Sequence, residues 1–237
     1  MIYVANNAAK QWILEELANQ QPDRILDLAC GNGKVWQRFL QQHPALRVLG
    51  VDTDTRAIEQ GKKMYGESQN IELRVHDAQA PVQEGSFDVV VALSAIEHVV
   101  DRPAFLRTVW TALKSGGVAY LNYDAGHFRS HNLKEYLMIP ISQALARLGF
   151  EGPYMKEVDD ALFSSQANQI GFEMIELRKH NIFFLKHFMR SAEDGALEDW
   201  FDFEKRMNRH FSSAALDRLM WSSTLVIRKP KTADSSV

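Results

Sequence analysis

Near the start of the chain, a run of small residues and glycines directly follows a stretch of apolar ones. Residues 24–28 read Arg-Ile-Leu-Asp-Leu, and such a short apolar run bounded by turn formers predicts a buried strand. Residues 29–33 are small and include two glycines, which favours a sharp turn with positive φ angles. Apolar residues then recur at helical spacing from Val35 to Leu40. A strand, turn and helix in this order present backbone N–H groups and a helix N-terminus, which suit a carboxylate or a phosphate.

The spacing of the glycines distinguishes two kinds of nucleotide-binding turn. The NAD fingerprint needs a third glycine three residues after the second, and Trp36 stands there instead, which disfavours an NAD-dependent enzyme. Counted from Ala29, however, Ala29, Gly31 and Gly33 alternate with other residues just after the acidic Asp27. This pattern resembles motif I of the class I S-adenosylmethionine (SAM)-dependent methyltransferases, with Ala29 in place of the usual first glycine. For this motif alone, an unrelated α/β turn is the alternative.

Acidic residues also follow the second predicted strand, over residues 46–51. Asp52 stands where a nucleotide-binding βαβ unit places the carboxylate that binds the ribose hydroxyls, with Thr53 beside it. Asp54 is instead expected to cap the helix predicted over residues 55–65. For Asp52 as well, a purely structural capping role is the alternative to ligand binding.

The third predicted strand, residues 71–75, is followed by Asp77 and Ala78. In the resembled family, an acidic residue at the position of Asp77 often accepts a hydrogen bond from the adenine amino group. A solvent-exposed loop aspartate is the alternative.

The fourth predicted strand, residues 87–93, is almost continuously apolar, as expected of a strand that is buried on both faces. It ends in Leu93 and Ser94, which are expected to border the cofactor. The following Glu97-His98-Val99 is similar to a signature of small-molecule methyltransferases that include the ubiquinone-biosynthesis O-methyltransferases. Leu-Lys-Ser-Gly-Gly before a fifth strand, residues 118–123, is a further match.

The resemblance extends over residues 25–123 and implies that the chain binds SAM and releases S-adenosylhomocysteine. The cofactor-binding residues implied are Asp27, Ala29, Gly31, Gly33, Asp52, Thr53, Asp77, Ala78, Leu93 and Ser94. The alternation of strands and helices independently predicts a parallel sheet with helices on both faces. The expected fold is therefore α/β, a doubly wound, Rossmann-like sheet of seven mostly parallel strands with an antiparallel last strand.

The second half of the chain supplies the remaining elements of one methyltransferase domain. A helix is predicted from Asp159 or Asp160 to Gln169, a sixth strand over residues 173–183, and a last strand over residues 224–228 as an antiparallel edge strand. Residues 127–158 and 184–221 are expected to be helical lid insertions, because loops beyond the carboxyl ends of parallel strands bind ligands. Most aromatic side chains there should form core, and a few could line an apolar pocket.

Methyl transfer from an activated donor mainly requires alignment of the acceptor and exclusion of water. A base is needed only for an acceptor that keeps its proton at neutral pH, and His98 is the best candidate because the fourth strand should end facing the methyl group. The alternative is that the imidazole braces the loop. Tyr123, His127 and His131 are weaker candidates. Where some related enzymes bind a metal through two glutamates and a histidine, Ser94 replaces the first glutamate, so no metal site is expected.

Absent motifs narrow the methyl acceptor. No Asn/Asp-Pro-Pro-Tyr/Phe motif and no cysteine follow the fourth strand, which disfavours the methylation of exocyclic amines and of pyrimidine carbons. The expected acceptor is an O or N atom of a small, partly apolar molecule. The competing interpretation is a non-catalytic SAM-binding partner or sensor protein.

Composition limits the setting of the protein. With 27 basic and 30 acidic residues and a net charge of −3, no nucleic-acid partner is expected. The single cysteine indicates a reducing compartment, and Cys30 is expected to be a small buried residue rather than a nucleophile. Without a visible signal peptide or a run of about 18 apolar residues, a cytoplasmic location without membrane association is expected. The sequence gives no indication of oligomeric state.

Overall fold

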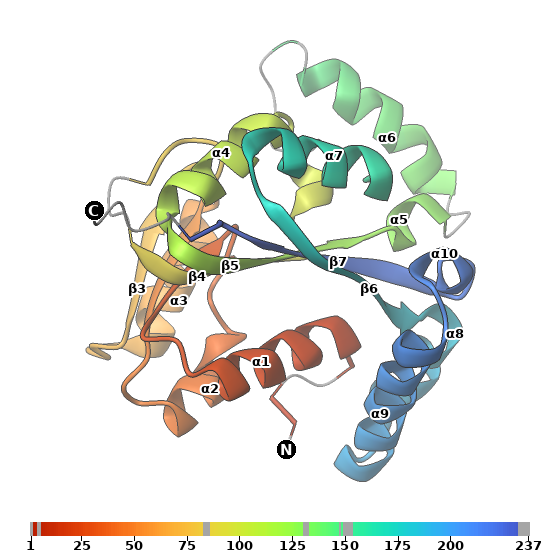
Figure 1. Ribbon diagram of the computed structural model, residues 1–237, viewed down its shortest axis with the longest axis horizontal. Coiled ribbons are helices and arrows are strands. Elements are labelled where there is room, and N and C mark those ends of the chain that lie inside the picture. The colour runs from red at the N-terminus through yellow and green to blue at the C-terminus, as the bar shows by residue number, and fades with distance from the viewer. Residues whose placement is uncertain are drawn as a thin grey trace, which may run out of the picture.

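A computed structural model places a seven-stranded sheet between two layers of helices (Figure 1). It describes residues 2–3, 6–82, 86–129, 133–146, 148 and 154–231. The strand order is β3-β2-β1-β4-β5-β7-β6. The strands are β1 (Arg24–Leu28), β2 (Arg47–Asp52), β3 (Ile71–Val75), β4 (Phe87–Leu93), β5 (Leu113–Asp124), β6 (Glu173–Ile182) and β7 (Met220–Arg228).

Among the described residues, one α-helix precedes the first strand and the others follow or connect the strands. They are α1 (Ala8–Gln20), α2 (Trp36–Gln42), α3 (Thr55–Tyr65), α4 (Arg102–Ala112), α5 (Gly126–Arg129), α6 (Leu133–Ala146), α7 (Asp160–Ile170), α8 (Phe183–Phe188), α9 (Asp194–His210) and α10 (Ser213–Leu216). Several begin at a side chain that accepts backbone N–H groups of the first turn, namely Asn7, Asp54, Asp101 and Asp159.

Each face of the sheet has its own apolar core. Phe105 and Leu106 of α4 and Phe163 of α7 pack on one face. Trp12 of α1 and Phe39 of α2 pack on the other. Because both faces are covered, the central strands are apolar in almost every position, as the sequence predicts.

The pairings confirm the expected doubly wound, mostly parallel sheet and its antiparallel last strand. β1 pairs in parallel with β2 and β4, and the pairs β2–β3 and β4–β5 are also parallel. β7 runs antiparallel to both β5 and β6. The carboxyl ends of β1, β2, β3, β4, β5 and β6 therefore meet at one edge of the sheet, called the carboxyl edge below.

The prediction that the last strand lies at the sheet edge is wrong. β7 lies between β5 and β6, and its run Leu225-Val226-Ile227 is buried. The edge position belongs to β6, whose first half exposes Met174 and Ile175. The helix layers on the two faces of the sheet bury this apolar run, and the neighbouring strands β5 and β6 pair with its backbone on both edges.

The fifth strand is longer than its apolar run indicates. α4 ends at Ala112 and β5 starts directly at Leu113, five residues before the predicted start. The register against β4 shifts between Phe87 and Val89, and Gly116 adopts a φ of 80° in the same stretch. An irregularity at glycine lets the chain remain in the sheet where a regular strand would end.

The two expected insertions lie on opposite faces of the sheet. Figure 1 shows α6 on the side of α4 and α7, and α9 on the side of α1. Trp200 and Phe201 of α9 pack against Ala8 at the start of α1. Parts of the first insertion, residues 130–132, 147 and 149–153, lie outside the described residues. Whether either insertion acts as a lid stays a prediction.

Candidate functional site

The turn after β1 has the strained backbone that its small residues predict. Ala29, Gly31 and Gly33 have φ angles of 60°, 57° and 68°. Positive φ is costly for alanine, and such strain is typical of ligand-binding turns. A Cβ atom built on Gly31 would meet no other atom within 4 Å, so open space lies above this turn. A ligand could therefore approach its backbone closely.

Asp52, at the end of β2, holds this turn in place. Its Oδ2 accepts a hydrogen bond from the backbone N–H of Gly31 at 2.7 Å, and its Oδ1 accepts one from Asp54 at 2.8 Å. A carboxylate can accept about four hydrogen bonds, so acceptor positions remain for a ribose diol. Thr53 next to it is exposed. Asp54 caps α3 through Arg56 and Ala57, which confirms the capping prediction.

Asp27 lies beneath the turn rather than on its open surface. The residue is 1% exposed, and its Oδ2 accepts a 2.7 Å hydrogen bond from Nε1 of the fully buried Trp36. Burial raises the pKa of Asp27 to about 7, although the hydrogen bond from Trp36 opposes the shift. Trp36 thus fills the position of the third NAD glycine and supports the turn from below. Burial also raises the thiol pKa of Cys30, which argues against a nucleophile.

The ends of β3 and β4 complete the same side of the carboxyl edge. The exposed Asp77 accepts a hydrogen bond from the backbone of Gln79 at 2.9 Å, and Ala78 is buried. Leu93 is buried, and Ser94 adopts a φ of 60°. The expected cofactor residues of all four strands therefore gather at one edge, and their contacts with SAM stay predictions.

His98 lies on the short 3₁₀ turn η1 (Ile96–His98) after β4. Its Nδ1 is 3.1 Å from the carbonyl oxygen of Tyr154. A carbonyl only accepts, so in the neutral ring the proton is on Nδ1 and the lone pair on Nε2. The ring therefore braces the first insertion, as the structural alternative has it, and still keeps one basic nitrogen for an acceptor.

The other candidate bases are weaker. Tyr123 donates its hydroxyl to Asp160 Oδ1 at 2.7 Å, and burial together with this carboxylate raises its pKa well above the usual value. Its phenol therefore stays protonated. The side chain of His127 and the whole of His131 lie outside the described residues.

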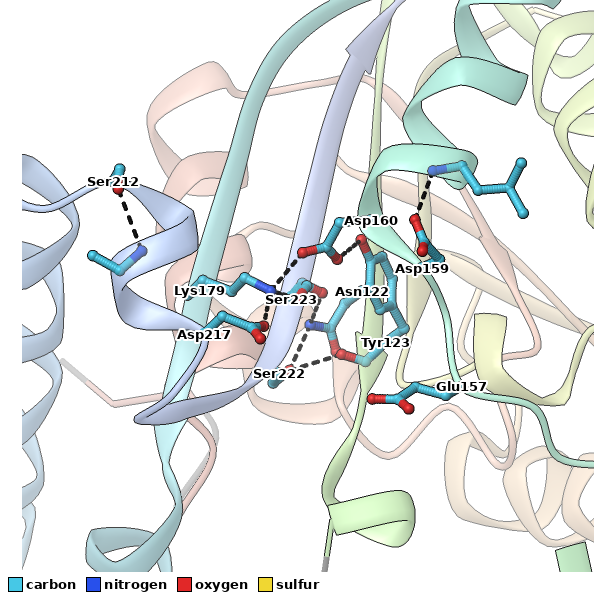
Figure 2. A network of polar contacts seen from close by, with 12 residues as sticks. Asn122, Tyr123, Glu157, Asp159, Asp160, Lys179, Ser212, Asp217, Ser222 and Ser223 are labelled. Carbon is cyan, nitrogen blue, oxygen red and sulfur yellow. Dashed lines mark hydrogen bonds and ion pairs between the residues drawn. The ribbon is translucent and has the colours of Figure 1, made fainter.

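A pocket of about 510 Å³ opens beside this site, between β5, β6, β7 and the start of α7. Its volume is that of a small-molecule site. At its base, the ammonium group of Lys179 donates to Asp160, Asp217 and Ser223 at 2.6, 2.7 and 2.9 Å (Figure 2). Burial alone would raise the pKa of the Asp217 carboxyl group, but the nearby charges of Lys179 and Arg129 outweigh burial and lower this pKa.

The sequence did not indicate this pocket. The end of β5 connects it to the exit of β4. Asn122 Oδ1 accepts from both the backbone N–H and the Oγ of Ser94 at 3.2 Å. Its amide nitrogen donates to Thr224 and to Ser222 on β7, and the contact with Ser222 is drawn in Figure 2. Glu97 accepts from the backbone of Asp124 at 3.3 Å. The pocket wall and the exit of β4 are thus parts of one bonded unit.

Two further findings concern the described residues. No group of three histidine, cysteine, aspartate or glutamate side chains among them is arranged to hold a metal ion. None of the helices in this part of the chain combines the length and apolar character needed to cross a bilayer.

Comparison with known proteins shows what part of the chain is similar to. Residues 26–121 match the family model of a methyltransferase domain. The chain is 30% identical over 122 residues to trans-aconitate 2-methyltransferase of Deinococcus radiodurans, a match that covers 51% of this chain and 46% of that protein. It is 27% identical to a ubiquinone biosynthesis O-methyltransferase of Aeromonas salmonicida, over 59% of this chain and 57% of that protein. The chain thus spans only about half the length of these relatives.

A solved structure extends the likeness of the fold to almost the whole chain. A S-adenosylmethionine dependent methyltransferase from Mesorhizobium loti superposes with a TM-score of 0.60 at 18% identity, over 93% of this chain and 97% of that one. The motif turn, the strand order and the family match agree. Residues 26–121 therefore match a methyltransferase domain, and the chain as a whole has the fold of the SAM-dependent methyltransferases.

Proposed function

We propose that this protein transfers a methyl group from SAM to an O or N atom of a small, partly apolar molecule. The observation that carries the proposal is the turn after β1, where Asp52 fixes the backbone of Gly31 under open space. This turn lies within the stretch that matches the methyltransferase domain. Open space above a backbone turn and an adjacent carboxylate suit an adenosyl and amino-acid ligand.

The residues of the chain divide the work between two sides of the carboxyl edge. The turns after β1, β2 and β3 would hold the cofactor, with Asp52 on the ribose and Asp77 near the adenine. Leu93 and Ser94 would border the sulfonium, which supplies an already activated methyl group. The pocket over β5, β6 and β7 would hold the acceptor, and its apolar side is formed by Met220 and by Trp221, whose ring stacks on Phe183 at 3.6 Å.

His98 is the proposed base for an acceptor, such as an alcohol or a phenol, that does not lose its proton to water at neutral pH; an amine needs no such base. Its Nε2 keeps a lone pair because Nδ1 is directed at the Tyr154 carbonyl. The ring does not line the pocket, so proton removal would require the acceptor to extend from the pocket toward η1.

The experiment has two stages. Calorimetry should detect SAM and S-adenosylhomocysteine binding and much weaker binding of NADH. Incubation with SAM and a panel of small alcohols, phenols and amines should then release S-adenosylhomocysteine with some of them. Binding of SAM without turnover on any acceptor would support the non-catalytic partner or sensor, and absence of SAM binding would refute the proposal.

A further inference from the structure

The pocket over β5, β6 and β7 has a charge pattern that restricts its ligand. Of its fourteen lining residues, five are carboxylates and two are cations, a formal balance of −3. The excess alone could be a solvated surface feature. What matters is which of these charges are already engaged within the protein.

Both cations of the pocket are paired with carboxylates of the pocket itself. Lys179, whose side chain is 3% exposed, uses its three ammonium hydrogens on Asp160, Asp217 and Ser223. Arg129 uses all three guanidinium nitrogens on Glu157 and on the backbone and carboxylate of Asp217. No donor of Lys179 is therefore left for an anionic ligand, and the charge of Arg129 is paired with two carboxylates of the pocket itself.

The carboxylates, by contrast, keep acceptor positions that face the pocket. Asp160 accepts two hydrogen bonds, from Tyr123 and Lys179, although a carboxylate can accept about four. Glu157 is joined to Arg129 through one oxygen at 3.3 Å, and its side chain is 48% exposed. Hydrogen-bond donors with positive charge fit such a site, and anions do not.

The apolar wall adds a second requirement. Trp221 is fixed in its orientation by stacking on Phe183. A ring in this position can pack against an apolar body and can also attract a cation to its face.

From these features we infer that the pocket binds a small amine with an apolar body as the methyl acceptor. This inference rests on the proposed function and names the acceptor class for it. The ammonium form is held among the carboxylates, and one proton leaves to water before the reaction. The nitrogen lone pair then forms the N–C bond while the C–S bond breaks, its electron pair stays on sulfur, and the product ammonium loses a proton to water afterwards.

The location of the pocket fits this role. Tyr123 and Asp124, which line it, follow Asn122, the partner of Leu93 in the register of β4 and β5. Adjacent strands lie about 4.8 Å apart. The pocket therefore begins about one strand spacing from the β4 exit that borders the proposed methyl group.

Three probes with one apolar body and different head groups test the inference. They are 2-phenylethylamine, 2-phenylethanol and phenylacetate, each titrated into the protein saturated with S-adenosylhomocysteine and each incubated with SAM. We expect the amine to bind about tenfold or more tightly than the other two, and to be the probe that releases S-adenosylhomocysteine. Equal or tighter binding of the alcohol or the carboxylate, or no binding of the amine, would overturn the inference.

A matched pair of variants shows whether the pocket charge is responsible. Glu157→Gln removes a half-exposed carboxylate that is paired with an arginine in the pocket, and should weaken amine binding about fivefold while leaving the SAM affinity within twofold. Glu72→Gln removes an arginine-paired carboxylate on β3, at the opposite end of the sheet, and should change neither. Equal amine affinity in both variants would refute the pocket assignment. If the wild-type protein does not bind SAM, the proposed function itself is refuted.

Discussion

Asp52 provides the sharpest test of the cofactor site, because it has a structural and a proposed ligand role in the same carboxylate. Its two oxygens accept the backbone N–H groups of Gly31 and Asp54. In Asp52→Ala both hydrogen bonds are lost, at a cost of about 1 kcal/mol each. A loss of ~2 kcal/mol in a chain of this size lowers the melting temperature by about 4–8 °C.

The ligand role of Asp52 has a separate magnitude. Hydrogen bonds from a ribose diol to a carboxylate contribute about 1.5–3 kcal/mol, so the SAM affinity of Asp52→Ala should fall roughly 10–150-fold. The matched control is Asp54→Ala, two residues away. It removes the cap of α3, lowers stability by about 1 kcal/mol and should leave the SAM affinity unchanged.

A ligand analogue separates a lost ribose contact from a loosened turn. The wild-type protein should bind the 2′-deoxy analogue of S-adenosylhomocysteine more weakly than S-adenosylhomocysteine itself, whereas Asp52→Ala should bind both equally. This is a double-mutant cycle with one change in the ligand. If the analogue loses as much affinity in Asp52→Ala as in the wild type, the ribose is held elsewhere and the assignment of Asp52 is refuted.

Three further predictions follow from the same edge of the sheet. Gly31→Val should keep its far-UV circular dichroism but bind SAM poorly in calorimetry, since its side chain would enter the open space above the turn at a φ of 57°; normal affinity in a folded variant would contradict close approach of the ligand. If the ring of His98 is the base, His98→Ala should lower the turnover rate about 10²–10⁴-fold and leave the SAM affinity unchanged. Wild-type activity of this variant would show that His98 has only a structural role, through its hydrogen bond to Tyr154. The pKa of Asp27 is about 7 in the folded protein, against an ordinary value near 3.8, so between these pH values the folded protein binds a proton that the unfolded chain does not. The contribution of Asp27 to the free energy of unfolding is therefore complete below about pH 4 and is lost as the pH rises toward 7. Asp27→Asn cannot ionise and keeps an oxygen for Trp36, so urea unfolding across this range should show less loss of stability than in the wild type; parallel curves would show that Asp27 does not titrate there.

The elements that the sequence predicts well are those with local causes. The turn after β1 is specified by consecutive small residues, and its positive φ angles follow from them. Asp54 lies directly before a run of helix formers and caps that helix. In the same way, the apolar runs of β1 and β4 required burial on both faces, and the sheet provides it.

The errors concern relations between distant parts of the chain. Whether the last strand lies at the sheet edge depends on whether β6 pairs with its free edge. No residue type within β7 indicates this pairing. Lys179 shows the same limit. In the sequence it is one of several charged residues in a predicted strand, yet its partners Asp160 and Asp217 are 19 and 38 positions away.

This difference has a physical origin in how the two halves of the proposed site are built. The proposed cofactor half consists of backbone N–H groups in a tight turn, so it appears in the sequence as a short, contiguous motif. The proposed acceptor half consists of side chains from β5, β6, β7 and α7, which only the completed sheet brings together. Asn122, fully buried, bonds to Ser94 on one side and to Ser222 on the other, and so ties the two halves together. Because a buried amide that loses its hydrogen-bond partners destabilises the fold, this connection fixes the pocket over β5, β6 and β7 relative to the exit of β4. A change of acceptor is thus open to substitutions at the pocket wall, while the motif by which the family is recognised stays the same.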